Sequence, residues 1–171
     1  MQIGARFVLE FFSKSYFGEY ECTVDTQRRL ALPSNWRRAD GRDNNFVLFP
    51  GRHDSLALVP ADMVDELIAS LRKLSFANPD AFLPMANIGA RAQVCTCDRQ
   101  GRFGINQGLL EDAGIDGRAT LVGAVTFIQI WKPESWKALR ADTTIGLDVI
   151  QTIQEGNTDL TSLLKNLGGG R

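Results

Sequence analysis

Two segments of the chain place an arginine four residues after an aspartate. Asp25 and Arg29 lie in the run ECTVDTQRRLAL, and Asp98 and Arg102 lie in the run VCTCDRQGRFGI. A guanidinium group matches phosphate oxygens or the O6 and N7 atoms of guanine, and it also pairs with a carboxylate. Each arginine is therefore a candidate for nucleic-acid contact or for an ion pair that locks a turn. The ion pair is the favoured reading for Arg102, because no arginine-rich stretch follows it.

A basic segment follows the first pair. Residues 28–42 carry five arginines and one acid, for a net charge of +4, whereas the whole chain has a net charge of −1 and a pI near 5.8. The overall charge argues against a uniformly basic nucleic-acid binder, but a local patch attracts polyanions whatever the total. The alternative is a solvated basic face. The candidates for phosphate contact are Arg28, Arg29, Arg37, Arg38 and Arg42.

The similarity between the two segments continues along the chain. Asn45–Pro50 corresponds to Ala119–Ala124, and Leu56–Pro60 corresponds to Ile128–Lys132. The period of a little over 70 residues is too long for a solenoid repeat. We predict two duplicated modules at 17–75 and 92–140, joined by a helical segment at 76–91, with an N-terminal extension at 1–16 and a partly disordered C-terminal extension at 141–171.

Alternating apolar residues and turn residues predict short strands and helices. Each aspartate–arginine turn is expected to join two strands into a hairpin. An amphipathic helix beginning at Asp62 has one apolar face, and the apolar helix that begins at Pro79 is expected to be buried. The predicted strands are 6–12, 19–24, 29–32, 46–49, 56–59, 92–97, 102–105, 119–122 and 127–131. The predicted helices are 35–39, 62–74, 107–113 and 133–140, in addition to the one from Pro79.

The cysteines and the histidine do not form a pattern typical of catalysis or metal binding. Cys95 and Cys97 share one face of a strand, Cys22 is the repeat equivalent of Cys95, and His53 is the single histidine. A tetrahedral metal site needs about four ligands. We predict packed thiols, no metal, no cofactor and no enzymatic activity. No apolar run is long enough for a membrane span, and the unpaired thiols favour a cytoplasmic protein.

The chain resembles the MraZ family of bacterial transcriptional regulators from about residue 17 to residue 139. The resemblance is carried by F-G-E-Y-E at 17–21, by D-x-x-x-R followed by L-x-L-P at 25–33, and by D-x-Q-G-R at 98–102. It is also carried by L-V-G, I-Q-I-W and W-K between residues 121 and 137. Two departures stand out: Arg28 occupies a position where the family usually has glycine, and Asn106 replaces an expected proline.

The resemblance implies a fold class of α+β, mainly β, built from tandem duplicated swapped-hairpin barrel halves of the AbrB/SpoVT, double-psi-like type with short helices. It implies a homo-oligomeric ring that binds short direct repeats in double-stranded promoter DNA and represses its own division and cell-wall operon, in the cytoplasm at the nucleoid. Asp25 and Asp98 would be structural, while the six arginines would contact DNA: Arg28, Arg29, Arg37, Arg38, Arg42 and Arg102. The alternative is a ring-forming interaction protein that has lost operator binding.

Overall fold

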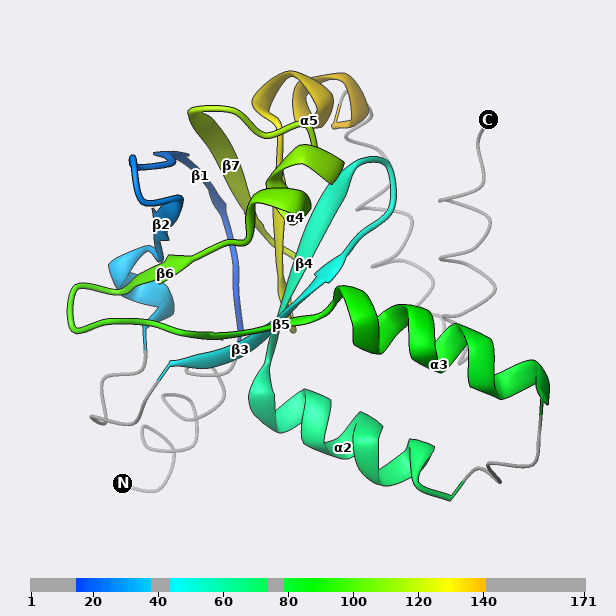
Figure 1. The fold of residues 1–171 in the computed structure, drawn as a ribbon. Coiled ribbons are helices and arrows are strands. Elements are labelled where there is room, and N and C mark those ends of the chain that lie inside the picture. The colour runs from blue at the N-terminus through cyan, green and yellow to red at the C-terminus, as the bar shows by residue number, and fades with distance from the viewer. Residues whose placement is uncertain (1–14, 38–43, 74–78, 141–171) are drawn as a thin grey trace, which may run out of the picture. The chain divides into compact units, whose positions relative to one another are not determined.

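The structure, a computed structural model, describes residues 15–37, 44–73 and 79–140 (Figure 1). The chain divides into two compact units, Met1–Ser135 and Trp136–Arg171, and only 136–140 of the second unit are described. The strand predicted at 6–12 and most of both extensions lie outside the described residues. None of the described helices has the length and apolar character required to cross a bilayer.

Eight strands occur in the described residues. Six of them form one antiparallel sheet in the order β1-β7-β8-β4-β3-β5, and the other two form a separate β2–β6 pair. The strand predictions within this part of the chain are confirmed to within one or two residues at each end. The strands are β1 (Glu19–Thr23), β2 (Arg29–Ala31), β3 (Asn45–Pro50), β4 (Ser55–Pro60), β5 (Gln93–Thr96), β6 (Arg102–Gly104), β7 (Arg118–Gly123) and β8 (Ile128–Trp131).

The two repeats exchange strands. β1 pairs with β7, β2 with β6 and β3 with β5, so each of these ladders joins one repeat to the other. The predicted hairpins are therefore wrong in their pairing, because β1 and β2 lie in different sheets. In each turn the backbone bond that joins the two strand ends runs from the aspartate N–H to the arginine carbonyl, at 3.0 Å from Asp25 to Arg29 and at 2.8 Å from Asp98 to Arg102. A second backbone bond closes the turn itself. Beyond these bonds the flanking strands part, and each finds its partner in the other repeat.

The strand register also corrects the alignment of the repeats. Cys22 pairs with Ala119, and its equivalent Cys95 pairs with Phe46, so Phe46 rather than Asn45 is the equivalent of Ala119. The correction matters because side chains alternate between the faces of a strand, and a shift of one residue exchanges the two faces. With the corrected register, buried residues of β3 fall on buried residues of β7.

A single apolar cluster fills the space between the sheet and the β2–β6 pair. The inward-facing residues of that pair, Leu30 and Phe103, lie opposite one another and are almost completely buried. Burying an aliphatic or aromatic side chain of this size stabilises the fold by about 1.5–3 kcal/mol. Trp36 and Trp131 are also buried. The other large side chains that are fully buried in the described part of the chain are Leu32, Leu48, Leu56, Leu58, Leu121, Ile128, Ile130 and Thr120.

Four α-helices and one 3-10 turn occur in the described residues. The helix predicted at 35–39 is only the 3-10 turn, η1 (Ser34–Trp36), and Ser34 does not cap it with its side chain. Gly114, two residues beyond the end of α4, has a φ of +60°, in the left-handed conformation that commonly ends a helix. The α-helices are α2 (Ala61–Leu71), α3 (Pro79–Arg91), α4 (Gln107–Asp112) and α5 (Pro133–Leu139).

The predicted burial of the helix from Pro79 is wrong, and the apolar face predicted for the helix from Asp62 is also partly exposed. On α2 Val64 is buried, but Leu67 is 48% exposed; on α3 Phe82, Leu83 and Ile88 are 52–63% exposed. Both helices extend away from the strands (Figure 1), and their contacts with the sheet fall on β3 and β4. An amphipathic pattern records where apolar residues lie on a helix, but it does not determine whether another element covers them.

Candidate nucleic-acid interface

The first turn is organised around the Asp25 carboxylate. Its Oδ1 accepts the backbone N–H groups of Gln27 and Arg29, both at 2.9 Å, and its Oδ2 accepts the Arg29 Nε–H at 2.8 Å. The Arg28 N–H also donates to the Asp25 carbonyl at 2.9 Å. One side chain therefore holds the backbone of the turn and the arginine that follows it. The predicted pairing of Asp25 with Arg29 is present.

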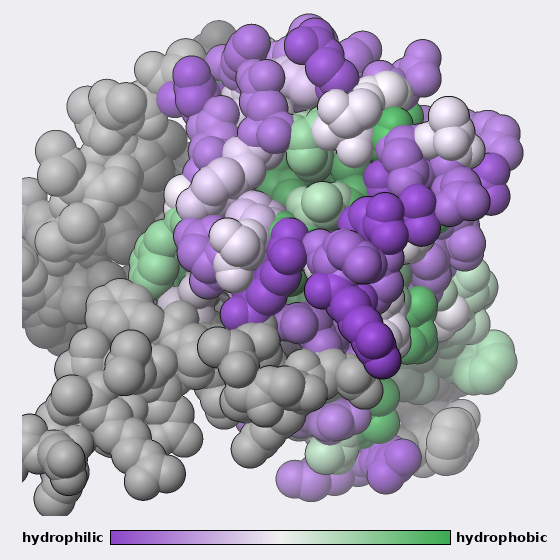
Figure 2. Space-filling model, turned by 90° about the vertical axis from the view of Figure 1, so that its left-hand side faces the viewer, coloured by the Kyte–Doolittle hydropathy of each residue, from purple (hydrophilic) through white to green (hydrophobic). Residues whose placement is uncertain are grey.

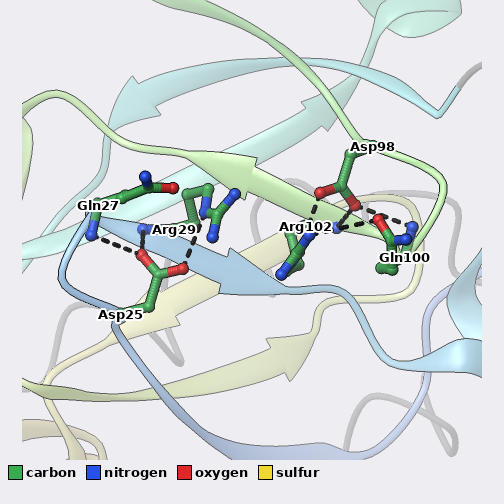
Figure 3. Close-up of polar contacts among 6 residues, drawn as sticks. All are labelled: Asp25, Gln27, Arg29, Asp98, Gln100 and Arg102. Carbon is green, nitrogen blue, oxygen red and sulfur yellow. Dashed lines mark hydrogen bonds and ion pairs between the residues drawn. The ribbon is translucent and has the colours of Figure 1, made fainter.

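The second turn repeats these contacts almost atom for atom (Figure 3). Asp98 Oδ1 accepts the N–H groups of Gln100 (2.9 Å) and Arg102 (2.8 Å), and Oδ2 accepts the Arg102 Nε–H at 2.9 Å. Gln100 adds one contact, because its Oε1 accepts from an Arg102 Nη at 3.3 Å. The role of Gln27 and Gln100 was missed by the sequence reasoning, although their matched places two residues after each aspartate could have indicated it.

Both aspartates are held in the charged form. Hydrogen bonds donated by backbone N–H groups, above all that of the arginine four residues later, lower the pKa of Asp25 and of Asp98 below the ordinary value of 3.8, and the arginine guanidinium adds to the effect. The ion pairs and the turn bonds therefore persist at neutral pH, where both partners of each pair are charged.

The β2–β6 pair turns its two arginines to the same side. Leu30 and Phe103 point into the core, so the alternation of a strand places the other residues of both strands on the outer face. In the register, Arg29 lies opposite Gly104, and Arg102 lies opposite Ala31. Each arginine thus faces a residue with little or no side chain. The side of the molecule that carries this pair is largely hydrophilic (Figure 2).

The two arginines are similarly accessible. The Arg29 side chain is 31% exposed and that of Arg102 is 39% exposed. The ion pairs use Nε, and within the described residues the Nη atoms of Arg29 have no hydrogen-bond partner. The ion pair and an outward contact are therefore compatible for both arginines, and the structure does not separate Arg102 from Arg29 in this respect.

The departure at Arg28 has a conformational consequence. Arg28 has a φ of +57°, in the left-handed region that favours glycine, and its equivalent Gly101 has a φ of +76°. Both residues use their carbonyls in the same way: Ile105 N–H donates to Arg28 at 2.9 Å, and Leu32 N–H donates to Gly101 at 2.8 Å. These bonds link each turn to the other repeat.

The remaining candidate arginines fall into two groups. Arg38 and Arg42 lie outside the described residues. Arg37 is half-buried, and its Nε donates to the Leu32 carbonyl at 2.8 Å. Its side chain lies over Gly101, where an added Cβ would overlap with it. The basic segment at 28–42 therefore includes one arginine, Arg37, whose side chain contacts other parts of the protein.

A groove lies beside the first turn. It has a volume of about 540 Å³, and its walls include Asp25, Arg28, Leu110, Glu111 and Asp116. The acids on its wall offset the positive charge of Arg28. In the register of the repeats, Leu110 is the equivalent of Arg37. Beside the second turn the Arg37 side chain lies over Gly101, whereas beside the first turn Leu110 lines the open groove.

The three cysteines are free thiols. Cys95 is buried, and Cys22 and Cys97 are half-buried against the core, which confirms the prediction that they are packed. Burial raises the pKa of Cys22 and Cys97 to about 11 and that of Cys95 to about 12. At neutral pH these groups are protonated, and thiolate chemistry is suppressed.

The fold and the site together define a class of proteins: a duplicated β domain whose interleaved halves each present an aspartate–arginine turn. The chain belongs to the MraZ family. The family model described as "MraZ protein, putative antitoxin-like" matches residues 16–83 and 88–148. The two matched segments correspond to the two repeats.

Curated relatives agree with this assignment. The chain is 33% identical over 123 residues to a "Transcriptional regulator MraZ" of Thermomicrobium roseum, covering 72% of this chain and 85% of that protein. It is 34% identical over 124 residues to the protein of the same name from Herpetosiphon aurantiacus, with the same coverage. The Alkaliphilus metalliredigens protein is 29% identical over 140 residues, covering 82% of this chain and 96% of the relative.

Proposed function

We propose that the protein is a sequence-specific, DNA-binding transcriptional regulator and not an enzyme. The observation that carries the proposal is the outer face of the β2–β6 pair, where Arg29 and Arg102 each stand opposite a small residue. A two-stranded β-ribbon fits the major groove of B-DNA, and arginine is the side chain best suited to guanine edges and to phosphates. The relatives' name, transcriptional regulator, supports the same function.

The proposed contact surface consists of Arg28, Arg29 and Arg102. Asp25 and Asp98 fix the two turns, and the small residues Ala31 and Gly104 let the ribbon approach a nucleic acid closely. Arg38 and Arg42 remain candidate phosphate contacts from the segment that follows β2. Each turn carries two arginines and one aspartate, Arg28 and Arg29 with Asp25, and Arg99 and Arg102 with Asp98, so both turns have a net positive charge despite the acidic total.

We also propose that the protein acts as a homo-oligomeric ring. A few contacts per subunit would bind weakly, whereas several linked copies gain about 10²–10⁴-fold in avidity. Short direct repeats in a promoter suit such an array. On this proposal the protein represses its own division and cell-wall operon, in the cytoplasm at the nucleoid.

The finer fold assignment belongs to the same proposal. We propose that the repeats at 17–75 and 92–140 form swapped-hairpin, double-psi-like barrel halves of the AbrB/SpoVT type. The support comes from the exchange of strands between the repeats, which pairs β1 with β7 and β3 with β5.

The test is binding of the protein to the DNA upstream of its gene. Fluorescence anisotropy would compare a fragment containing short direct repeats with a scrambled duplex of equal length. We expect Arg29→Ala and Arg102→Ala each to weaken specific binding by about 10- to 150-fold, the range for loss of one good base contact. Arg72→Ala removes an exposed charge at the end of α2, away from the ribbon, and is the matched control.

Two outcomes would overturn the proposal. A double Arg29→Ala/Arg102→Ala protein that remained oligomeric and bound its promoter like the parent would exclude the ribbon as the contact surface. Equal affinity of the parent for specific and scrambled duplexes would favour the alternative, a ring-forming interaction protein without operator binding. The exposed apolar side chains of α2 and α3 are the observation in favour of that alternative.

A further inference from the structure

Arg37 connects the first repeat to the turn of the second. Its Nε donates to the Leu32 carbonyl at 2.8 Å, and the Leu32 N–H donates to the Gly101 carbonyl, also at 2.8 Å. The guanidinium and the end of the aliphatic stem lie against Gly101, in space that a Cβ at position 101 would occupy. Gly101 directly precedes Arg102. Arg37 therefore contacts the backbone that leads into the second arginine of the ribbon.

The position of Arg37 is itself determined by the core. Trp36, its chain neighbour, is buried, and its ring meets Tyr16 and Tyr20 edge-on at centroid distances of 5.9 and 4.9 Å. Its indole N–H donates to the Phe17 carbonyl at 3.1 Å. With Trp36 held from three sides, the residue after it leaves η1 at a defined place. From this place the Arg37 side chain folds back onto Leu32, where its Nε–H reaches the carbonyl.

The first turn has no counterpart of this contact. There Arg28 stands in place of Gly101, and Leu110, whose side chain cannot donate a hydrogen bond, stands in place of Arg37. The space beside the turn is the groove of about 540 Å³ described above. The internal repeat thus provides a natural comparison between a braced turn and an open one.

We propose that Arg37 is a positioning residue: it braces the second turn from the first repeat and thereby sets where Arg102 stands on the ribbon, instead of contacting DNA itself. Its planar guanidinium fits over a residue without a side chain, and its Nε–H satisfies a carbonyl at the end of β2. The inference rests on the proposed function only where it states that the position of Arg102 matters for DNA binding. The brace itself is a property of the folded chain.

The electrostatics at Cys97 agree with this placement. Burial is the main cause that raises the pKa of the Cys97 thiol to about 11, and the positive charge of Arg37 opposes that rise. Cys97 immediately precedes Asp98, at the start of the second turn. The guanidinium of Arg37 is therefore close enough to act on both sides of this turn.

The first test measures the brace without DNA. Hydrogen–deuterium exchange would be followed in peptides covering 97–104 and 24–31 of the intact oligomer. In Arg37→Leu, which copies Leu110 of the other repeat, we expect exchange at 97–104 to rise by about tenfold, the effect of losing one hydrogen bond to a charged donor. Exchange in the first turn itself, at 25–28, should not change, because only residues 29–31 of that peptide pair with β6. Arg99→Leu is the control, because it removes the same charge from the second turn but leaves Arg37 in place.

The second test separates positioning from phosphate contact. Loss of one phosphate contact lowers the slope of log K against log salt by about 0.9, whereas loss of a positioning residue weakens binding at an unchanged slope. We expect Arg37→Leu to bind its promoter about tenfold more weakly with the parent's slope, and Arg37→Lys, which keeps the charge, not to restore the affinity. A reduced slope with unchanged exchange at 97–104 would overturn the proposal.

The two tests also distinguish this inference from the proposed function. If the parent protein bound no DNA but Arg37→Leu still raised exchange at 97–104, the proposed function would be refuted and the brace would stand. Unchanged exchange in Arg37→Leu, whatever its DNA affinity, would refute the brace.

Discussion

The two turns of the molecule have the same hydrogen bonds but different surroundings. In each, an aspartate accepts two backbone N–H groups and the Nε–H of an arginine four residues later, at distances that agree within 0.1 Å. Beside the second turn, Arg37 fills the space over Gly101. Beside the first turn, an open groove lies next to Arg28.

This difference distinguishes the contacts that form a turn from the contacts that neighbouring elements make with it. The contacts within five residues are enough to form the turn, because the first copy forms it without a contact like that of Arg37 and the second copy forms it with one. The neighbours determine how rigidly the turn is held and how accessible it is. We therefore expect substitutions within the shared contacts to act equally on both turns, and substitutions in the surroundings to act on one turn.

The largest effect is expected from Gly101→Ala. An alanine at a φ of +76° is strained, and its Cβ would push the end of the Arg37 side chain away from the Leu32 carbonyl. We expect the strain and the lost hydrogen bond together to lower the free energy of unfolding by about 2–4 kcal/mol. Chemical denaturation at a fixed protein concentration measures it. Gly108→Ala, on α4 with open space around the new Cβ, is the control and should not destabilise the protein. A Gly101→Ala protein as stable as the parent would show that the contact between Arg37 and Gly101 does not stabilise the second turn.

The next effect is expected from Asp25→Ala and Asp98→Ala. Each removes the acceptor of two backbone N–H groups and of one guanidinium. We expect both variants to melt at a lower temperature than the parent, by similar amounts, and by less than Gly101→Ala. Asparagine at either position keeps one acceptor oxygen and should recover part of the loss. Unequal effects of the two alanine variants in thermal melts would show that the shared contacts are not equivalent.

A smaller effect of opposite sign is expected from Arg28→Gly. Replacing a non-glycine residue at a φ of +57° relieves steric strain, which we expect to stabilise the fold by about 0.5–1 kcal/mol. The variant gives the first turn the sequence of the second at this position, Gln-Gly-Arg. It should also weaken DNA binding, because a charge next to Arg29 is lost. Denaturation and anisotropy on one preparation would measure both changes, and a destabilised variant would contradict the strain argument.

The smallest expected effect is a change in melting temperature at acid pH. The pKa of Asp25 and of Asp98 is lowered on folding, so their contribution to stability is fully present above the unfolded value of 3.8. It is lost as the pH falls below that value toward the folded pKa. The difference in melting temperature between the parent and Asp25→Asn/Asp98→Asn should therefore be constant from neutral pH to about 5 and then shrink. A difference that persisted unchanged into strong acid would argue that the carboxylate charge plays no part.

Much of the local structure was predictable from the sequence. The strands around Asp25 and Asp98, the pairing of each aspartate with its arginine and the burial of Trp36 follow from alternation and turn chemistry. The exposure of α3 was not predictable in this way. Apolar residues on α3 suggested a buried helix, yet Phe82 is 60% exposed, because the number of apolar residues does not show which element covers them.

The sequence by itself determined the two turns and the repeat, because their bonds join groups no more than four residues apart and need no distant partner. The tertiary structure decided which strands pair. β1 and β2 separate directly beyond the turn and pair with β7 and β6 of the other repeat. Only that exchange brings Arg29 and Arg102 to one face and lays Arg37 of the first repeat over Gly101 of the second. Contacts of this kind depend on the packing of the whole core, which local preferences do not specify.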